Sequence, residues 1–198
     1  VQKGAAGGPI SEEEARKIQR RRPITTDHAD AIRSKVKTVD LVGSELWSFG
    51  HVAKYKDKQT NTNLTLCGGT PEYAPNNTHY VYLGRNLTSE DIKISRNVAV
   101  IGFAVANELF PWTDPIQKTV KIDGRKYTVI GVFEEKKSAL GGNYDNYLLI
   151  PISTFKRYYG DRDPRGFDRS VNITVNARSP ELLQDAIAEV RSVMRFER

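Results

Sequence analysis

The sequence is poor in cysteine and in long apolar runs, and both shortages exclude whole classes of protein. Cys67 is the single cysteine among 198 residues, so an internal disulfide and a CxxC metal or redox motif are impossible. No apolar run approaches the ~18–20 residues that a membrane-spanning helix needs, and no signal peptide is visible. The chain begins with Val1 and a linker-like stretch of glycine and alanine. We therefore expect a piece of a longer protein.

The signature of a nucleotide-binding turn is incomplete. Residues 98–110, VAVIGFAVANELF, begin with an apolar strand, a glycine and a short helix. The dinucleotide fingerprint G-x-G-x-x-G falls on Gly102, Ala104 and Asn107, and only the first of these is glycine. No Walker A pattern occurs, because no Lys-Ser follows the glycines of the loop 140–143. We interpret Gly102 as the end of a strand.

Cysteine and histidine are not arranged for catalysis or metal binding. A nucleophilic cysteine needs a base beside it, and nothing in the sequence places a histidine next to Cys67. A cysteine in an apolar strand is most often a small core residue. His28, His51 and His79 share no metal-ligand spacing. We therefore predict no catalytic, cofactor-binding or metal-binding residue.

Charged residues gather in two segments. The net charge is +6, and much of the excess lies near the start, at Arg16, Lys17, Arg20, Arg21 and Arg22. Such a cluster binds phosphates of nucleic acid or anionic lipid, and it is also typical of a solvated linker. The acidic side chains form a solvated run at Glu12, Glu13 and Glu14 and a loop group at Asp161, Asp163 and Asp168. The loop group lacks the residue order of a calcium loop.

Periodicity predicts helices and strands in a mixed order. Residues 24–36 read as a helix with Thr26 as N-cap, and Ser153 is expected to cap a helix that ends at Gly160. The last helix follows Ser179, and its predicted apolar stripe contains Leu183, Ala186, Ile187, Val190 and Met194.

Hairpins are prominent among the predicted strands. The clearest is residues 119–135, whose turn is Asp123-Gly124, a dipeptide that favours the type I′ conformation. Strands also alternate with helices less strictly than in a doubly wound sheet. The pattern therefore indicates an α+β fold.

The second half of the chain carries an ordered series of motifs. In chain order they are VAVIG at Val98 to Gly102, Leu109-Phe110, DPIQK at Asp114 to Lys118, IDGRKYTVIGV at Ile122 to Val132, Gly141-Gly142, Asp145 to Pro151, and Ser153-Thr154. The series resembles the periplasmic core domain of MacB-type ABC transporter permeases over about residues 23–196. TTDHADAIRSKVKTV, GGTPEY and Leu83-Gly84-Arg85 fit more loosely. Gln117 departs from the family's usual glycine, and glutamine tolerates a positive φ poorly.

The resemblance implies a two-lobed domain, and the polar composition of the segment before it predicts a poorly ordered arm. Residues 1–22 would be a flexible charged arm, and residues 23–198 the MacB-like periplasmic core domain. A porter-like βα lobe would be built from about residues 23–50 and 145–198. An inserted, mostly-β lobe would span about residues 51–144.

The resemblance also implies a function without chemistry of its own. The domain would lie on the periplasmic side of the bacterial cytoplasmic (inner) membrane and would couple cytoplasmic ATP hydrolysis to export by mechanical transmission. Its partners would be an ABC ATPase domain or subunit, a second permease protomer and a membrane-fusion adaptor, with no cofactor and no nucleic acid. Apolar spans would precede Val1 and follow Arg198. A nucleotide-dependent or hydrolytic enzyme using the Gly102 turn and a basic nucleic-acid-binding module are the alternatives.

Overall fold

The computed structural model describes residues 1–3, 11–136 and 145–197. The chain divides into two units, residues Val1–Glu45 with Asp161–Arg198, and residues Leu46–Gly160. It passes between the units twice, inside strand β1 (Val39–His51) and directly after helix α6 (Ile152–Tyr159). No described helix combines the length and the apolar character needed to cross a membrane. The limits of the lobes inferred from the resemblance stay predictions.

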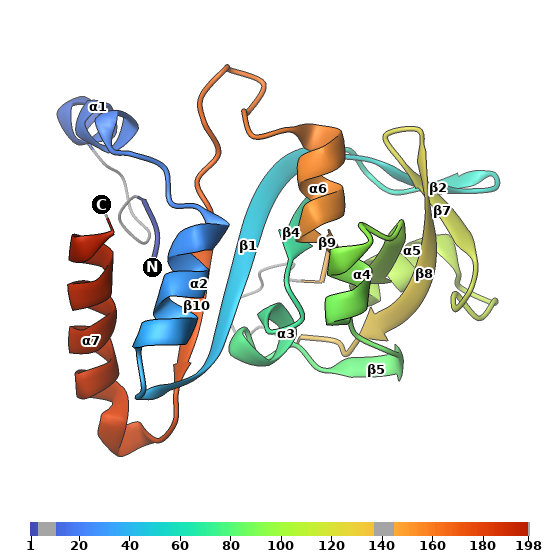
Figure 1. The fold of residues 1–198 in the computed structure, drawn as a ribbon. Helices are drawn as coiled ribbons and strands as arrows, with labels where there is room; N and C mark the ends of the chain where they lie inside the picture. Colours follow the sequence, from blue (N-terminus) through green and yellow to red (C-terminus); the bar gives the residue numbers. More distant parts are fainter. Residues whose placement is uncertain (4–10, 137–144, 198) are drawn as a thin grey trace. The chain divides into compact units, whose positions relative to one another are not determined.

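The first unit is built from both ends of the chain. Its elements are α1 (Glu12–Arg20), α2 (Thr26–Lys35), the first part of β1, β10 (Asn172–Ala177), the 3₁₀ turn η1 (Pro180–Leu182) and α7 (Leu183–Phe196). β1 and β10 pair antiparallel, and α2 and α7 lie beside each other (Figure 1). Thr38 Oγ1 donates to Glu189 of α7 over 3.0 Å, which ties the end of the α2–β1 connection to that helix.

The helices of this unit follow their predicted periodicity, with two corrections. Ala29, Ile32 and Val36 are buried, as their spacing requires. The N-cap of α2 is Thr25 rather than Thr26, because Thr25 has the extended backbone of a cap and its N–H donates to His28 Nδ1 over 3.0 Å.

The stripe of α7 is shorter than predicted. Ala186, Val190 and Met194 are buried, whereas Ile187 is half-buried and Leu183 is 49% exposed. Leu183 begins the helix, and an apolar stripe is covered only where another element runs alongside it.

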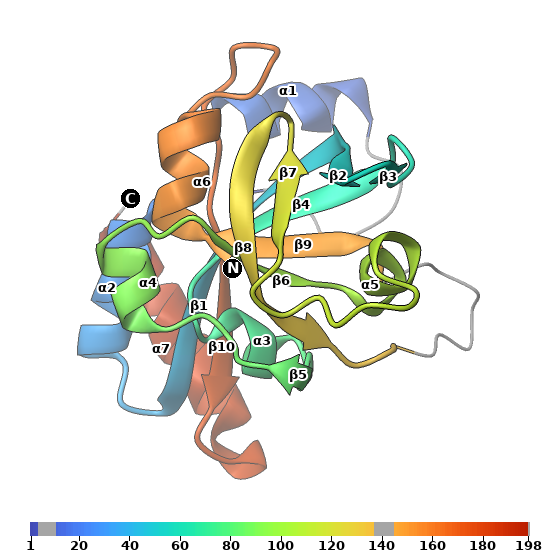
Figure 2. The same cartoon turned by 90° about the vertical axis from the view of Figure 1, so that its right-hand side faces the viewer.

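The second unit is a mixed sheet with helices beside it. Its elements are β2 (Ala53–Tyr55), β3 (Lys58–Gln59), β4 (Leu64–Gly69), α3 (Tyr73–Asn76), β5 (Val81–Gly84), α4 (Ser89–Lys93), β6 (Val98–Ile101), α5 (Phe103–Leu109), β7 (Thr119–Ile122), β8 (Arg125–Phe133), β9 (Tyr147–Pro151) and α6. The strand order is β4-β9-β6-β8-β7-β2-β3, and β5 also pairs with β8. The β4–β9 and β6–β8 pairs are parallel, and the others are antiparallel. In Figure 2, α4 and α6 lie to the left of the central strands and α5 to the right. The mixed architecture confirms the α+β prediction.

Two turns of this unit depend on a positive φ. Asp123 and Gly124 have φ of 49° and 81°, as the predicted Asp-Gly hairpin between β7 and β8 requires. Gln117 has φ of 61°, and its N–H donates to the carbonyl of Val129 over 2.8 Å. The chain therefore keeps a left-handed residue at the position where the resemblance implies glycine, at the cost of steric strain around the glutamine Cβ.

Candidate functional site

Gly102 ends β6, as predicted, and its position follows from a close backbone crossing. Its N–H donates to the carbonyl of Tyr147 over 2.9 Å, and α5 begins at the next residue. A Cβ at Gly102 would lie 2.1 Å from the carbonyl oxygen of Asp145. Only glycine fits there without moving one of the two segments. The loop 140–143 lies outside the described residues.

Each histidine has a structural partner of its own, and Cys67 is in the core. His28 Nδ1 accepts the N–H of Thr25 at the start of α2, His51 Nδ1 lies 2.6 Å from Asp123 Oδ2, and His79 Nδ1 lies 2.8 Å from the Tyr147 hydroxyl. Cys67 is fully buried, as expected for a small core residue. Among the described residues, no group of three His, Cys, Asp or Glu side chains could hold a metal ion.

The charged segments near both ends pair internally. Glu13 binds Lys17 over 2.8 Å within α1. In the loop before β10, Asp163 binds Arg165 over 2.9 Å and Asp168 binds Arg162 over 3.2 Å. The carbonyl of Asp161 accepts the N–H of Arg169 over 2.7 Å. Glu13, Asp163 and Asp168 thus each neutralise a neighbouring basic side chain.

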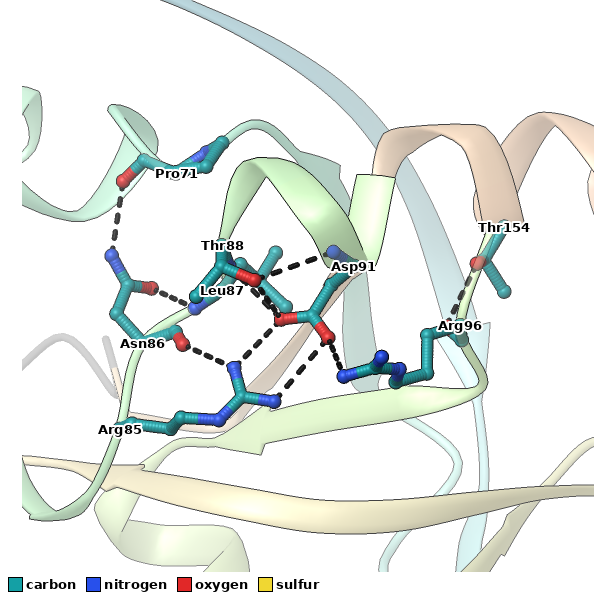
Figure 3. Close-up of polar contacts among 8 residues, drawn as sticks. All are labelled: Pro71, Arg85, Asn86, Leu87, Thr88, Asp91, Arg96 and Thr154. Atoms are coloured by element: carbon teal, nitrogen blue, oxygen red, sulfur yellow. Dashed lines mark hydrogen bonds and ion pairs between the residues drawn. The ribbon is translucent and has the colours of Figure 1, made fainter. Parts of the chain in front are cut away.

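The most strongly organised polar site is Asp91 in α4. Its side chain is fully buried and binds Arg85 Nη1 over 2.6 Å and Arg96 Nη1 over 2.9 Å (Figure 3). It also accepts the N–H of Thr88 over 3.0 Å and the Thr88 hydroxyl over 2.9 Å. The N–H of Asp91 donates back to Thr88 Oγ1, so the two residues form a capping box at the start of α4.

The pKa of Asp91 shows that its partners outweigh its burial. Burial alone would raise the pKa, but the hydrogen bonds from Arg85 and Thr88 and the charge of Arg85 lower it to about 2. Both arginine side chains are 43% exposed, so the carboxylate lies just below the surface. A carboxylate so weakly basic and so fully bonded is a poor general base. It is suited to holding segments together.

The backbone of β8 brings Arg85 within reach of Asp91. The N–H of Arg85 donates to the carbonyl of Ile130 over 2.9 Å. A Cβ at Gly131 would lie 2.3 Å from the carbonyl oxygen of Arg85. The glycine in β8 therefore permits the close approach that directs the guanidinium toward α4.

The Asp91 site continues into the first turn of α6. Thr154 Oγ1 donates to the carbonyl of Arg96 over 3.0 Å (Figure 3), and Ser153 Oγ donates to the carbonyl of Ile92 over 2.6 Å. Thr154 is fully buried. Ser153 is therefore not the N-cap that its sequence position predicted; Pro151 occupies that position, and the serine hydroxyl docks α6 onto the end of α4.

A second carboxylate, Asp123, holds the other end of α6. The Tyr159 hydroxyl donates to Asp123 Oδ2 over 2.9 Å, and His51 Nδ1 lies 2.6 Å from the same oxygen. Burial, with help from Tyr127 and Asp123, raises the pKa of Tyr159, so its hydroxyl keeps the proton that it donates. Because an ionised carboxylate only accepts, His51 Nδ1 is the donor in the other bond.

Asp123 thus joins the two segments by which the chain enters and leaves the second unit. His51 is the last residue of β1, which begins in the first unit. Tyr159 is the last residue of α6, one position before the chain leaves at Gly160. We call α6 with Asp91, Asp123 and their partners the α6 anchor. It is the candidate functional site.

Sequence reasoning found the elements of the α6 anchor and missed its side chains. The stretch LTSEDI, residues 87–92, predicts a helical turn with Thr88 or Ser89 as its cap, and Thr88 is the cap. The signal for Asp91 was present: a Thr-x-x-Asp box flanked by Arg85 and Arg96. Asp123 carried no such signal, because an Asp-Gly turn is explained by its backbone alone.

Comparison with known proteins identifies the family. The model of the MacB-like periplasmic core domain matches residues 1–193. The chain belongs to the MacB-like periplasmic core domain family. It is 31% identical over 170 residues to the macrolide export ATP-binding/permease protein MacB of Bdellovibrio bacteriovorus, covering 84% of this chain and 25% of that protein. It is 35% identical over 107 residues to the uncharacterised ABC transporter permease YvrN of Bacillus subtilis, covering 52% and 25%. The chain spans about a quarter of the length of these relatives.

Two solved structures share the fold of this MacB-like domain. The periplasmic region of MacB from Actinobacillus actinomycetemcomitans matches with a TM-score of 0.73 and 22% identity, covering 91% of this chain and 77% of that one. The extracellular domain of the ABC-type transporter YknZ from Gram-positive bacteria matches with a TM-score of 0.70 and 22% identity, covering 88% and 84%.

Several motifs that carry the family resemblance fall within the α6 anchor. Leu83-Gly84-Arg85 supplies Arg85, the hairpin motif supplies Asp123, and Ser153-Thr154 docks the start of α6. In this MacB-like domain, these motif residues therefore fix the helix next to one of the two passages between the units.

Proposed function

We propose that this chain is the extracytoplasmic domain of an ABC transporter permease subunit, on the periplasmic side of a bacterial cytoplasmic membrane. It receives conformational changes driven by ATP hydrolysis in the cytoplasm and passes them on during export. The observation that carries the proposal is the match of residues 1–193 to the MacB-like periplasmic core domain. The curated relatives named above are ABC permeases, and one is an export protein by name.

The α6 anchor supports a mechanical role for the domain. The chain connects the two units within β1 and directly after α6, so a displacement of the first unit acts on these two segments of the chain. β1 ends at His51 and α6 ends at Tyr159, and the side chains of both residues bind Asp123. A domain of two units joined in this way can transmit movement without any chemistry of its own.

The proposal also names the partners. ATP hydrolysis needs an ABC ATPase domain or subunit, and coupling in a permease needs a second protomer, so that the two domains move against each other. A membrane-fusion adaptor is the third partner in the cell envelope. The resemblance motivates all three partners.

Side-selective labelling of the full-length protein tests the placement of the domain. Trp112 is 94% exposed and lies in the second unit, so Trp112→Cys introduces a reactive thiol, whereas the native Cys67 is fully buried. Cells with a permeabilised outer membrane are treated with a membrane-impermeant maleimide before and after lysis. The proposal predicts labelling of the variant before lysis. Labelling that requires lysis contradicts it, and the parent protein controls for cysteines elsewhere.

A further inference from the structure

A pocket of about 250 Å³ lies in the second unit, and none of its lining residues belongs to the α6 anchor. Five of its lining side chains are aromatic rings, and one carries a positive charge. They are Trp47, Phe49, Tyr73, His79, Tyr147 and Lys136. None of the described residues that line the pocket is acidic. The pocket therefore combines an apolar aromatic surface with one cation.

The aromatic wall is a packed set of rings. His79 stacks on Tyr73 with a centroid distance of 5.6 Å and an interplanar angle of 11°, and it lies 5.1 Å from the ring of Tyr147. Trp47 meets Tyr73 edge to face at 5.9 Å. Tyr73 and Tyr147 are buried, whereas Phe49 is 74% exposed. The buried part of the wall is thus already packed, and the pocket opens to solvent at Phe49.

A chain of hydrogen bonds fixes the cation at this wall. Lys136 Nζ donates to the carbonyl of Asn77 over 2.7 Å and lies 3.4 Å from His79 Nε2, while His79 Nδ1 lies 2.8 Å from the Tyr147 hydroxyl. Burial and the charge of Lys136 lower the pKa of His79 to about 4, so the imidazole is neutral at pH 7. The ammonium therefore donates to Nε2, and Nδ1 carries the ring hydrogen.

The position of Lys136 leaves it able to bind a ligand. An ammonium has three hydrogens, and its two described partners use two of them. The carboxylate of Asp145 accepts the backbone N–H of Lys136 at 2.9 and 3.0 Å, which holds the backbone in place. No ion pair joins the Lys136 ammonium to a carboxylate among the described residues.

We propose that this pocket binds a small aromatic carboxylate, with its ring against Trp47, Tyr73 and Tyr147 and its carboxylate at the Lys136 ammonium. The volume suits one ring, because an apolar cavity of about 150 Å³ holds benzene and the remaining space accepts the carboxylate. The single fixed cation, with no lining carboxylate, selects an anion over a cation. The proposal does not depend on the transport function.

Tryptophan fluorescence offers a direct test in the complete 198-residue chain. The chain has two tryptophans, so Trp112→Phe leaves Trp47, inside the pocket, as the one reporter. This variant is titrated with benzoate, with neutral benzamide and with cationic benzylamine. We expect saturable binding of one benzoate, and binding of benzylamine at least tenfold weaker. Absence of a saturable benzoate signal, or equal affinity for benzoate and benzylamine, overturns the proposal.

A lysine variant tests whether the Lys136 ammonium binds the carboxylate of benzoate. In the Trp112→Phe background, Lys136→Met is expected to weaken benzoate binding about tenfold, as loss of a charge-assisted hydrogen bond does, and to leave benzamide binding unchanged. Retained benzamide binding shows that the pocket is folded. The exposed Lys126, on β8, supplies the matched control Lys126→Met, which should have no effect. Equal effects of the two lysine variants on benzoate overturn the assignment.

Discussion

The two ends of α6 are linked to carboxylates of very different character, to Asp91 indirectly through the carbonyl of Arg96 and to Asp123 directly through Tyr159. At the start of the helix, Asp91 is fully buried and bound by two arginines and a threonine. At the end, the side chain of Asp123 is 32% exposed and is bound by a histidine and a tyrosine. Separating a buried carboxylate from its ion-pair partners is costly. Water can replace the hydrogen bonds of a partly exposed carboxylate at a lower cost. We therefore expect the helix to be held more firmly at the Asp91 end than at the end next to the passage between units.

The largest effect on the free energy of unfolding is expected at Asp91, near the start of α6. Asp91→Asn removes the charge that Arg85 and Arg96 bind and leaves the capping box incomplete. We expect a loss of about 3 kcal/mol in the free energy of unfolding, measured by urea titration. Asp57 is exposed, and the matched change Asp57→Asn should stay within about 0.5 kcal/mol of the parent. Similar losses in the two variants would contradict the role given to Asp91.

Acid should weaken the same end of the helix. The pKa of Asp91 is about 2 in the folded chain against an ordinary 3.8, so its stabilisation is fully present above pH 4 and is lost as the pH falls toward 2. That difference corresponds to about 2 kcal/mol. The parent should therefore lose that much more stability than Asp91→Asn between pH 5 and pH 2. Parallel pH curves for the two proteins would refute the assignment.

A substitution at Asp123, near the end of α6, should lower the free energy of unfolding less than one at Asp91. Asp123→Asn keeps one acceptor oxygen and a partly exposed position, so we expect a loss of about 1 kcal/mol. The loss should be local: backbone amides at the end of α6 should exchange hydrogen faster, and those of α4 should not. The comparison fails if Asp123→Asn costs as much as Asp91→Asn, or if exchange rises equally at both ends.

The smallest expected effect touches neither carboxylate. Gln117 has φ of 61°, and glycine adopts that conformation without strain. Gln117→Gly should therefore raise the free energy of unfolding by roughly 0.5 kcal/mol, because relief of strain exceeds the added flexibility of the unfolded chain. Urea titration measures the change, and a loss of stability would show that the glutamine side chain contributes more than its strain costs.

The sequence predicted backbone features better than side-chain partnerships. The strand and helix around Gly102 and the Asp123-Gly124 hairpin were predicted correctly, because local periodicity and turn residues are enough to indicate both. Ser153 was predicted as a cap, yet its hydroxyl binds Ile92, 61 positions away in the chain. A local rule cannot anticipate such a partner.

The candidate site shows the same limit. Asp91 lies in a recognisable capping box, but its second arginine, Arg96, becomes a partner only through the turn after α4, where the N–H of Arg96 donates to the carbonyl of Asp91 over 2.9 Å. Asp123 gathers His51 and Tyr159 from 72 and 36 positions away. Tertiary packing alone brings these groups to one oxygen, so periodicity and motif spacing carry no trace of them.

Hydrogen exchange across α6 in the full-length protein tests most directly whether the two ends of the helix differ as proposed. Amide exchange would be measured by mass spectrometry, in the nucleotide-free state and in an ATP-trapped state. The account predicts that peptides around residues 156–161, at the Asp123 end, change their exchange between the states, while peptides around residues 89–97, at the Asp91 end, do not. Identical exchange throughout this domain in the two states, or a change confined to the Asp91 end, would contradict it.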